Sequence, residues 1–171
     1  SGATGNLGTV ISSGYSSVTG ITLNTAVAGP FTYGGIIGEG ATGMTLTKTG
    51  TGTQVLSGAN SYTGDTFVNG GTLTVGSGAN GSISSSSGLQ MGGGTFNYSR
   101  TGAGQTVDGL TVNAGNSTVN NTSSGQTLTL GGITRAGSAY GTVNFATLTG
   151  AINTSTTNTD GILGPWATTG S

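Results

Sequence analysis

The most constraining feature of this sequence is a run of short apolar segments between Leu46 and Gly78, LTKTGTGTQVLSGANSYTGDTFVNGGTLTVGSG. Most of these segments adjoin threonine, and turns rich in glycine, asparagine or serine separate them. Each has the length of a short strand and is too short for a helix. In Thr-Leu-Thr the leucine points to one side of a strand and both threonines to the other. Repetition of this arrangement predicts a coil with an apolar interior and a hydroxyl-rich exterior.

Strand-like segments continue beyond Gly78, and most are seven to twelve residues apart. This spacing also fits a β-sandwich or a barrel. Two observations favour a coil: the turns are not strictly those of two-residue hairpins, and asparagine recurs just after apolar strand residues. Side-chain amides stacked between coils would form ladders along the axis, as in cross-β stacks. The asparagines in question are Asn69, Asn97, Asn113 and Asn120.

Residues 46–50, 55–64 and 68–73 together resemble the autotransporter-associated β-strand repeat of very large secreted bacterial surface proteins. Residues 31–38 are similar to the coil that precedes such repeats, and residues 94–113 and 160–168 to their flanks. Pro165 stands where glycine is more usual in this family. The resemblance implies a right-handed parallel β-helix on an exported, cell-surface or extracellular protein, and it implies no catalytic residues.

A solenoid with about 20 to 25 residues per coil would make roughly seven or eight coils from 171 residues. We expect one all-β domain or segment over residues 1–171. The residues predicted to point inward are Leu46, Leu56, Val68, Leu73, Val75, Leu110, Val112, Leu128 and Leu130.

Composition argues against catalysis, metal binding and nucleic-acid binding. Only 7 of the 171 residues are charged, the net charge is −1, and there is no histidine or cysteine. The usual general base and the commonest metal ligands are therefore missing, and there is no basic patch for nucleic acid. Asp65 and Asp108 would come close only if their coils align, and aspartate is also a common turn residue. We expect no enzyme activity and no catalytic, cofactor-binding or metal-binding residues.

High glycine content with low charge also fits disorder, but apolar residues recur at strand-like intervals to the end of the chain. No apolar run approaches the ~20 residues of a membrane helix, so we expect no membrane insertion of this segment. Because the chain begins at Ser1 without a charged-then-apolar leader, we expect a mature form or an excised piece.

Threonine pairs flank a leucine at four places, at residues 45–47, 72–74, 127–129 and 147–149. Such pairs resemble ice-binding arrays, but their starts share no regular spacing, and threonine is favoured in strands for its branched side chain. The phenylalanines are expected in the core. The tyrosines are expected mostly beside the core with a wet hydroxyl, with stacking on sugars at the surface as the alternative for some of them. Trp166 is expected to cap the last coil or to pack on a neighbouring molecule.

Two functions remain open. The first is a stiff spacer or fibre whose copies stack end to end, because neither end carries an amphipathic helix or a charge cluster as a cap. Pro165 and Trp166 are the only candidates for a plug, at one end alone. The second is an adhesin or polysaccharide-binding module that uses the outer Thr/Asn/Tyr face. Both place the protein outside the cell or at a bacterial cell surface.

Overall fold

The computed structural model describes residues 16–27, 29–137, 140–157 and 167–169, and every regular element in them is a β-strand. The strands are β1 (Gly20–Asn24), β2 (Phe31–Tyr33), β3 (Thr45–Thr49), β4 (Thr53–Leu56), β5 (Thr66–Val68), β6 (Thr72–Gly78), β7 (Leu89–Met91), β8 (Thr95–Arg100), β9 (Gln105–Thr106), β10 (Leu110–Val112), β11 (Asn116–Asn121), β12 (Thr127–Thr129), β13 (Ile133–Arg135), β14 (Thr142–Leu148), β15 (Ala151–Asn153) and β16 (Ala167–Thr169).

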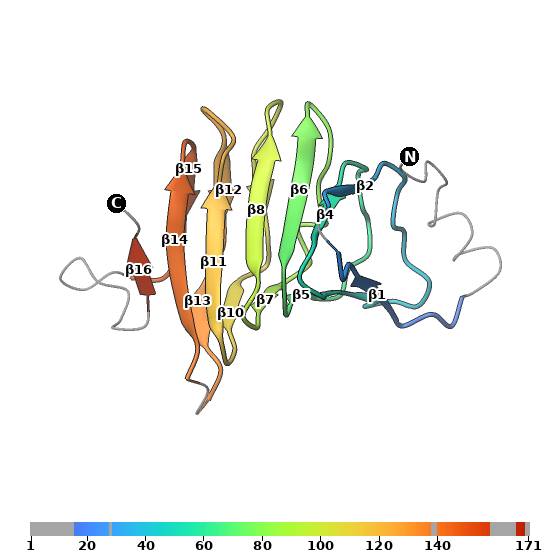
Figure 1. The fold of residues 1–171 in the computed structure, drawn as a ribbon, viewed down its shortest axis with the longest axis horizontal. Helices are drawn as coiled ribbons and strands as arrows, with labels where there is room; N and C mark the ends of the chain where they lie inside the picture. The colour runs from blue at the N-terminus through green and yellow to red at the C-terminus, as the bar shows by residue number, and fades with distance from the viewer. Residues whose placement is uncertain (1–15, 28, 138–139, 158–166, 170–171) are drawn as a thin grey trace.

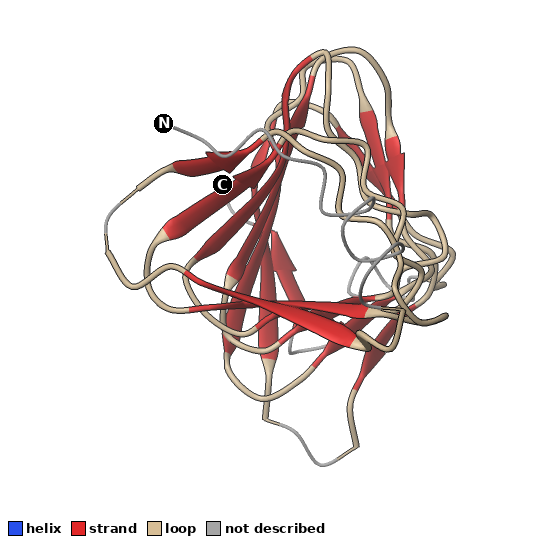
Figure 2. Ribbon diagram, turned by 90° about the vertical axis from the view of Figure 1, so that its right-hand side faces the viewer, coloured by secondary structure: helices blue, strands red, loops and turns tan. Residues whose placement is uncertain are grey.

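The strands form three parallel sheets, which we call walls A, B and C. Wall A has the order β1-β3-β5-β7-β10-β13, wall B the order β16-β14-β11-β8-β6-β4-β2, and wall C the order β15-β12-β9. Figure 1 shows wall B from the side, with its strands side by side along the long axis. Figure 2 looks along that axis, and the chain winds around a roughly triangular interior. The fold is thus an all-β parallel solenoid of about six turns.

The backbone ladder between turns determines this architecture. On wall A, Ile21 pairs with Leu46, and Leu46 pairs with Thr66, so one turn takes 20 to 25 residues, as predicted. About six turns are fewer than the seven or eight expected. Most turns are near the upper end of the predicted length, and residues 1–15 and 158–166 lie outside the described part of the chain.

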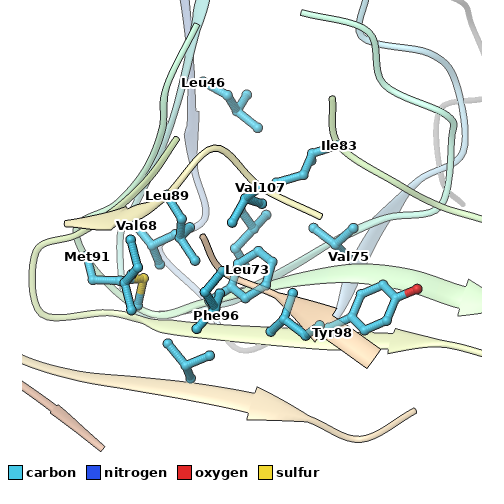
Figure 3. Close-up of a cluster of buried hydrophobic side chains, with 14 of the residues drawn as sticks. Leu46, Val68, Leu73, Val75, Ile83, Leu89, Met91, Phe96, Tyr98 and Val107 are labelled. Atoms are coloured by element: carbon cyan, nitrogen blue, oxygen red, sulfur yellow. The ribbon is translucent and has the colours of Figure 1, made fainter. Parts of the chain in front are cut away.

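The core runs as a continuous apolar column inside the three walls. All nine residues predicted to point inward are buried, which confirms the alternation of faces read from the sequence. Figure 3 labels ten of the core side chains that it draws, with Leu73, Phe96, Met91 and Val107 among them, converging from successive turns. Short strands provide a thin core, so the ladder between turns must carry much of the stability.

The prediction for phenylalanine was half right. Phe96 and Phe145 are buried, but Phe67 lies on the outer side of wall A and is half-buried. Phe31 has the register of a core residue, opposite Gln54, yet it is 45% exposed because β2 is the end strand of wall B. Strand alternation, and not residue type, decides which aromatic side chains enter the core.

Glycine allows neighbouring turns to approach closely at one corner. A Cβ atom added to Gly58 would lie 2.0 Å from the carbonyl oxygen of Gly35 in the preceding turn, which is backbone and cannot swing aside. Gly34, in contrast, has room for a methyl group, since the nearest atom is the Ser57 hydroxyl at 3.5 Å. Only some of the 37 glycines are therefore required by the spacing between turns.

Candidate functional site: the interior clamps, the walls and the two ends

A buried amide joins three successive turns. Asn60 lies in the Ser-Gly-Ala-Asn-Ser segment, with 4% of its surface exposed. Its Oδ1 accepts a hydrogen bond from the Ile37 N–H at 2.9 Å, and its Nδ2 donates to the carbonyls of Gly58 at 3.0 Å and Ser82 at 2.8 Å. Ile37 belongs to the preceding turn and Ser82 to the following one. The side chain thus replaces backbone hydrogen bonds where no regular strand of wall C is present.

Other amides do the same elsewhere in the interior. Gln105 accepts from the Ile83 N–H at 3.1 Å and donates to the Ile83 carbonyl at 2.9 Å. Asn121 donates to the carbonyl of Ala151 in the next turn at 2.7 Å. Gln54 donates to the Phe31 carbonyl of the preceding turn at 3.0 Å. These buried amides hold neighbouring turns together through side-chain hydrogen bonds, and the sequence analysis missed them.

Lys48 is a buried cation inside the solenoid. Like Leu46, it points to the inner side of β3, and it has no exposed surface. Its Nζ donates to the carbonyls of Thr49 at 2.6 Å, Gly50 at 3.1 Å and Gly70 at 3.1 Å, so it joins the corners of two turns. Burial lowers the pKa of this ammonium group. The alternation in Thr-Leu-Thr-Lys-Thr could have revealed the inward lysine.

Replacing Lys48 by methionine is expected to reduce stability and to remove a pH dependence. Without the ammonium group the carbonyls of Gly50 and Gly70 lose this donor, at a cost of about 1–3 kcal/mol. Because the folded-state pKa of Lys48 lies below its unfolded value, the unfolded chain binds more protons between these two pKa values. Wild-type stability should therefore rise with pH across that window, whereas Lys48→Met should lack this rise.

Urea midpoints measured from pH 7 to pH 9.5 test this prediction, with Thr47→Met on the outer side of the same strand as control. The series stops below pH 10, the ordinary pKa of tyrosine, so that most unfolded tyrosine remains protonated. Parallel pH profiles for wild type and Lys48→Met would contradict the assignment of the pH dependence to Lys48.

Glu39 organises the corner that leads into β3. Its Oε1 accepts hydrogen bonds from the N–H groups of Gly43 at 2.6 Å, Met44 at 3.2 Å and Thr63 at 3.2 Å, and from the Thr63 hydroxyl. The Thr63 hydroxyl bond is the largest cause of the lowered pKa of this carboxyl group. Glu39 is thus held by donors of two neighbouring turns and orders this corner.

A short chain of hydroxyl groups crosses the interior between two turns. The Tyr62 hydroxyl lies 2.8 Å from the Thr66 hydroxyl, which lies 2.8 Å from the Ser87 hydroxyl, and all three residues are fully buried. Burial raises the pKa of Tyr62. The expectation of a wet hydroxyl is therefore wrong for Tyr62, whose hydroxyl is buried. Tyr98 is buried too, and its hydroxyl donates to the Ala103 carbonyl. Tyr140 fits the expectation and is strongly exposed.

The four acids do not assemble into a catalytic pair among the described residues. Asp65 precedes β5 and Asp108 precedes β10, and the whole of β7 lies between these strands in wall A. Glu39 is occupied as described, and Asp160 lies outside the described residues. In the described part of the chain, no three potential ligands among histidine, cysteine, aspartate and glutamate group together. Nor do the described residues contain a helix that could cross a membrane.

The four threonine motifs are spread over three walls and do not stack on adjacent strands, which agrees with their irregular spacing in the sequence. Residues 45–47 belong to wall A and residues 127–129 to wall C, whereas residues 72–74 and 147–148 lie in β6 and β14 of wall B, with β8 and β11 between them. The register nevertheless produces a different array, a single column of threonines on the outer side of wall B. Pairing places one threonine from each of four adjacent strands in this column: Thr53, Thr72, Thr95 and Thr118.

The predicted asparagine ladder is only partly present. Asn97 and Asn120 are register partners on wall B. Asn69 and Asn113 have Gly92 between them, since Val68, Met91 and Val112 are register partners on wall A. Asn113 donates to Gln90 instead, at 3.2 Å. Pro165 and Trp166, the predicted plug, lie outside the described residues.

The two ends of the described solenoid differ from its middle. At the N-terminal end, β1 and β2 are the last strands of walls A and B, and Phe31, Ile36 and Val27 are exposed. At the other end β13, β16 and β15 close the three walls, and Leu148 is exposed. Figure 1 shows these ends at opposite extremes of the long axis. Each end strand has an outer edge that no described strand covers.

Comparison with known proteins gives one match. The family model described as the passenger-associated-transport-repeat matches residues 46–75, which span β3 to β6. This finding agrees with the resemblance seen in the sequence at residues 46–73. No match was found among curated proteins or among solved structures. A passenger repeat on a β-solenoid indicates a structural passenger that is secreted or exposed at a surface.

Proposed function

We propose that this chain is a non-enzymatic structural element, a stiff spacer at a bacterial cell surface or outside the cell that continues end to end from one copy to the next. The observation that carries the proposal is that, among the described residues, no strand covers the outer edge at either end of the solenoid. A parallel end strand carries N–H and C=O groups along its outer edge, and such edges pair readily with another strand. The next turn is supplied by a second copy or by a further stretch of a longer chain.

The exposed apolar residues support end-to-end contact. Phe31 is 45% exposed although its column, which continues through Gln54 and Leu73, is buried in the following turns. A further turn stacked on β2 would cover this ring in the same way. The net charge of −1 provides little repulsion between copies. Because such a head-to-tail contact does not close on itself, it propagates into a filament.

The absence of an aligned acid pair among the described residues supports the non-enzymatic part of the proposal. General acid-base catalysis needs two positioned groups with separate pKa values. Incubation with a panel of polysaccharides should release no new reducing ends. Cleavage that disappears in Asp65→Asn or Asp108→Asn would overturn this part.

Light scattering coupled to size-exclusion chromatography, over a wide concentration range, tests the stacking. Wild type should elongate with concentration, and electron micrographs should show filaments. Phe31→Lys places a charge on the core-facing column at the end and should stay monomeric. Thr118→Lys, in the middle of wall B, adds the same charge away from both ends and should elongate like wild type. A wild-type chain that stays monomeric at every concentration would contradict end-to-end association.

A further inference from the structure

Wall A presents an aromatic ring on its outer side. In β5 the side chains of Thr66 and Val68 are buried, so Phe67 between them points away from the core and is half-buried. Its register partners in the two adjacent turns are Thr47 and Gln90, which also point outward. A large apolar side chain in the middle of a polar wall is not needed for the core of this solenoid.

Polar groups next to this ring are held in place by hydrogen bonds across three turns. The Asn113 Nδ2 donates to the Gln90 Oε1 at 3.2 Å, and the Gln90 Nε2 donates to the Asp65 Oδ2 at 2.9 Å. Asp65 is two residues before Phe67 on the same side of the chain. Among the described residues, no hydrogen bond is found to the other carboxylate oxygen of Asp65. Oriented amides and a carboxylate thus border the aromatic ring on a lateral face.

We propose that Phe67, Asp65, Gln90 and Asn113 form a contact site for a neutral polysaccharide. The apolar C–H face of a sugar ring packs against Phe67, and sugar hydroxyl groups donate to the Asp65 carboxylate and pair with the free donor and acceptor positions of the two amides. The site lies on a lateral wall, away from both ends of the solenoid, so it does not depend on end-to-end stacking.

Charge selects the class of polysaccharide. Asp65 is the charged residue of this cluster, and Lys48 of the neighbouring strand points into the core. A uronic acid or sulfated polymer would meet the Asp65 carboxylate beside the ring, which is unfavourable. The exposed Arg135 of the same wall lies on β13, three strands away from β5. A protein partner is less well matched, because protein interfaces are centred on several large anchors, commonly tryptophan, tyrosine and arginine. This site has a single ring among short polar side chains.

The sequence alone did not indicate this cluster. These residues are spread over residues 65 to 113, and only the pairing of β5 with β7 and of β7 with β10 brings them together. The adhesin alternative named threonine, asparagine and tyrosine on the outer face, and Asn113 is the one member of this cluster that belongs to those residue types. The carboxylate and the phenylalanine are supplied by the turn that contains β5.

Affinity gel electrophoresis tests the site, with hydroxyethyl cellulose, dextran and galactomannan as neutral probes and polygalacturonate as the acidic probe. At least one neutral probe should retard wild type, and polygalacturonate should not. Phe67→Ala should weaken the retardation about tenfold and Gln90→Ala about threefold. Phe67→Tyr should retain binding, because the ring is preserved. Thr118→Ala on wall B is the matched control and should bind like wild type.

Thermal melting of each variant separates lost binding from lost folding. If Phe67→Ala unfolds, Gln90→Ala, which should bind more weakly, and Phe67→Tyr, which should bind like wild type, still decide the test. The proposal is overturned if no neutral probe retards wild type, or if polygalacturonate is preferred. It is also overturned if folded Phe67→Ala and Gln90→Ala bind as wild type does, since contact would then lie elsewhere.

Discussion

Asn60→Ala should lower the free energy of unfolding by about 2–3 kcal/mol, which is a large fraction of the stability of a small domain. The variant leaves the buried N–H of Ile37 without its partner, at 2.9 Å in the wild type. The carbonyls of Gly58 and Ser82 lose one donor each but keep backbone donors, the N–H groups of Ser82 and Asn60. The orphaned Ile37 N–H therefore accounts for most of the loss.

The control for this experiment is Asn97→Ala. Asn97 is an amide on the outer side of wall B that accepts a hydrogen bond from the exposed Thr122 hydroxyl at 3.1 Å. Its replacement should change stability by about 0.5 kcal/mol or less, as for most surface substitutions. Denaturant midpoints at constant m-value provide the comparison. Equal losses for the two variants would show that the buried position of Asn60 confers no special role.

Gly58→Ala should be the second strongly destabilising change, with a cost of about 2–3 kcal/mol. Its methyl group would lie 2.0 Å from the Gly35 carbonyl oxygen and 2.6 Å from the carbonyl carbon, so two turns must move apart locally. Gly34→Ala makes the same chemical change where the nearest atom is 3.5 Å away. This second variant should be neutral or stabilised by up to about 1 kcal/mol, because alanine restricts the unfolded chain.

Thermal melting of the two glycine variants tests this difference in sign. A matched pair of this kind removes helix or strand propensity as an explanation, since both positions lie in corners outside the strands. If Gly58→Ala melts at or above the wild-type temperature, the close approach between the turns is not a constraint on the fold.

Strand alternation predicted the core well. Leu73 and Val75 alternate with threonine, and both are buried, as are the other residues predicted to point inward. The alternation is a local property of an extended chain, so it can be read without knowing which strands pair. The repeat at residues 46–75 supplied the parallel coil, which spacing alone did not distinguish from a sandwich.

The polar interior was harder to predict because asparagine has two common roles. Asn60 follows Gly58 in a turn-like segment, and turn asparagines usually bond their own local backbone. Its partners in this fold, Ile37 and Ser82, are 23 and 22 residues away. Likewise, the cluster around Phe67 depends on the length of each turn, and a change of one residue in that length would move Gln90 to the other side of the sheet. Registers over such distances are set by the whole ladder.

The side-chain hydrogen bonds with which Asn60 and Lys48 join successive turns also have a mechanical consequence. Hydrogen bonds of a parallel solenoid run along its axis, so a pulling force applied at one end acts on one boundary between turns at a time, and the chain should lengthen in steps of about one turn. The boundaries are not equivalent: Asn60 holds two of them together, and Lys48 crosses the boundary between Gly50 and Gly70. In a single-molecule stretching experiment these boundaries should yield last, so the region of residues 37 to 82 would act as the part of the rod most resistant to extension.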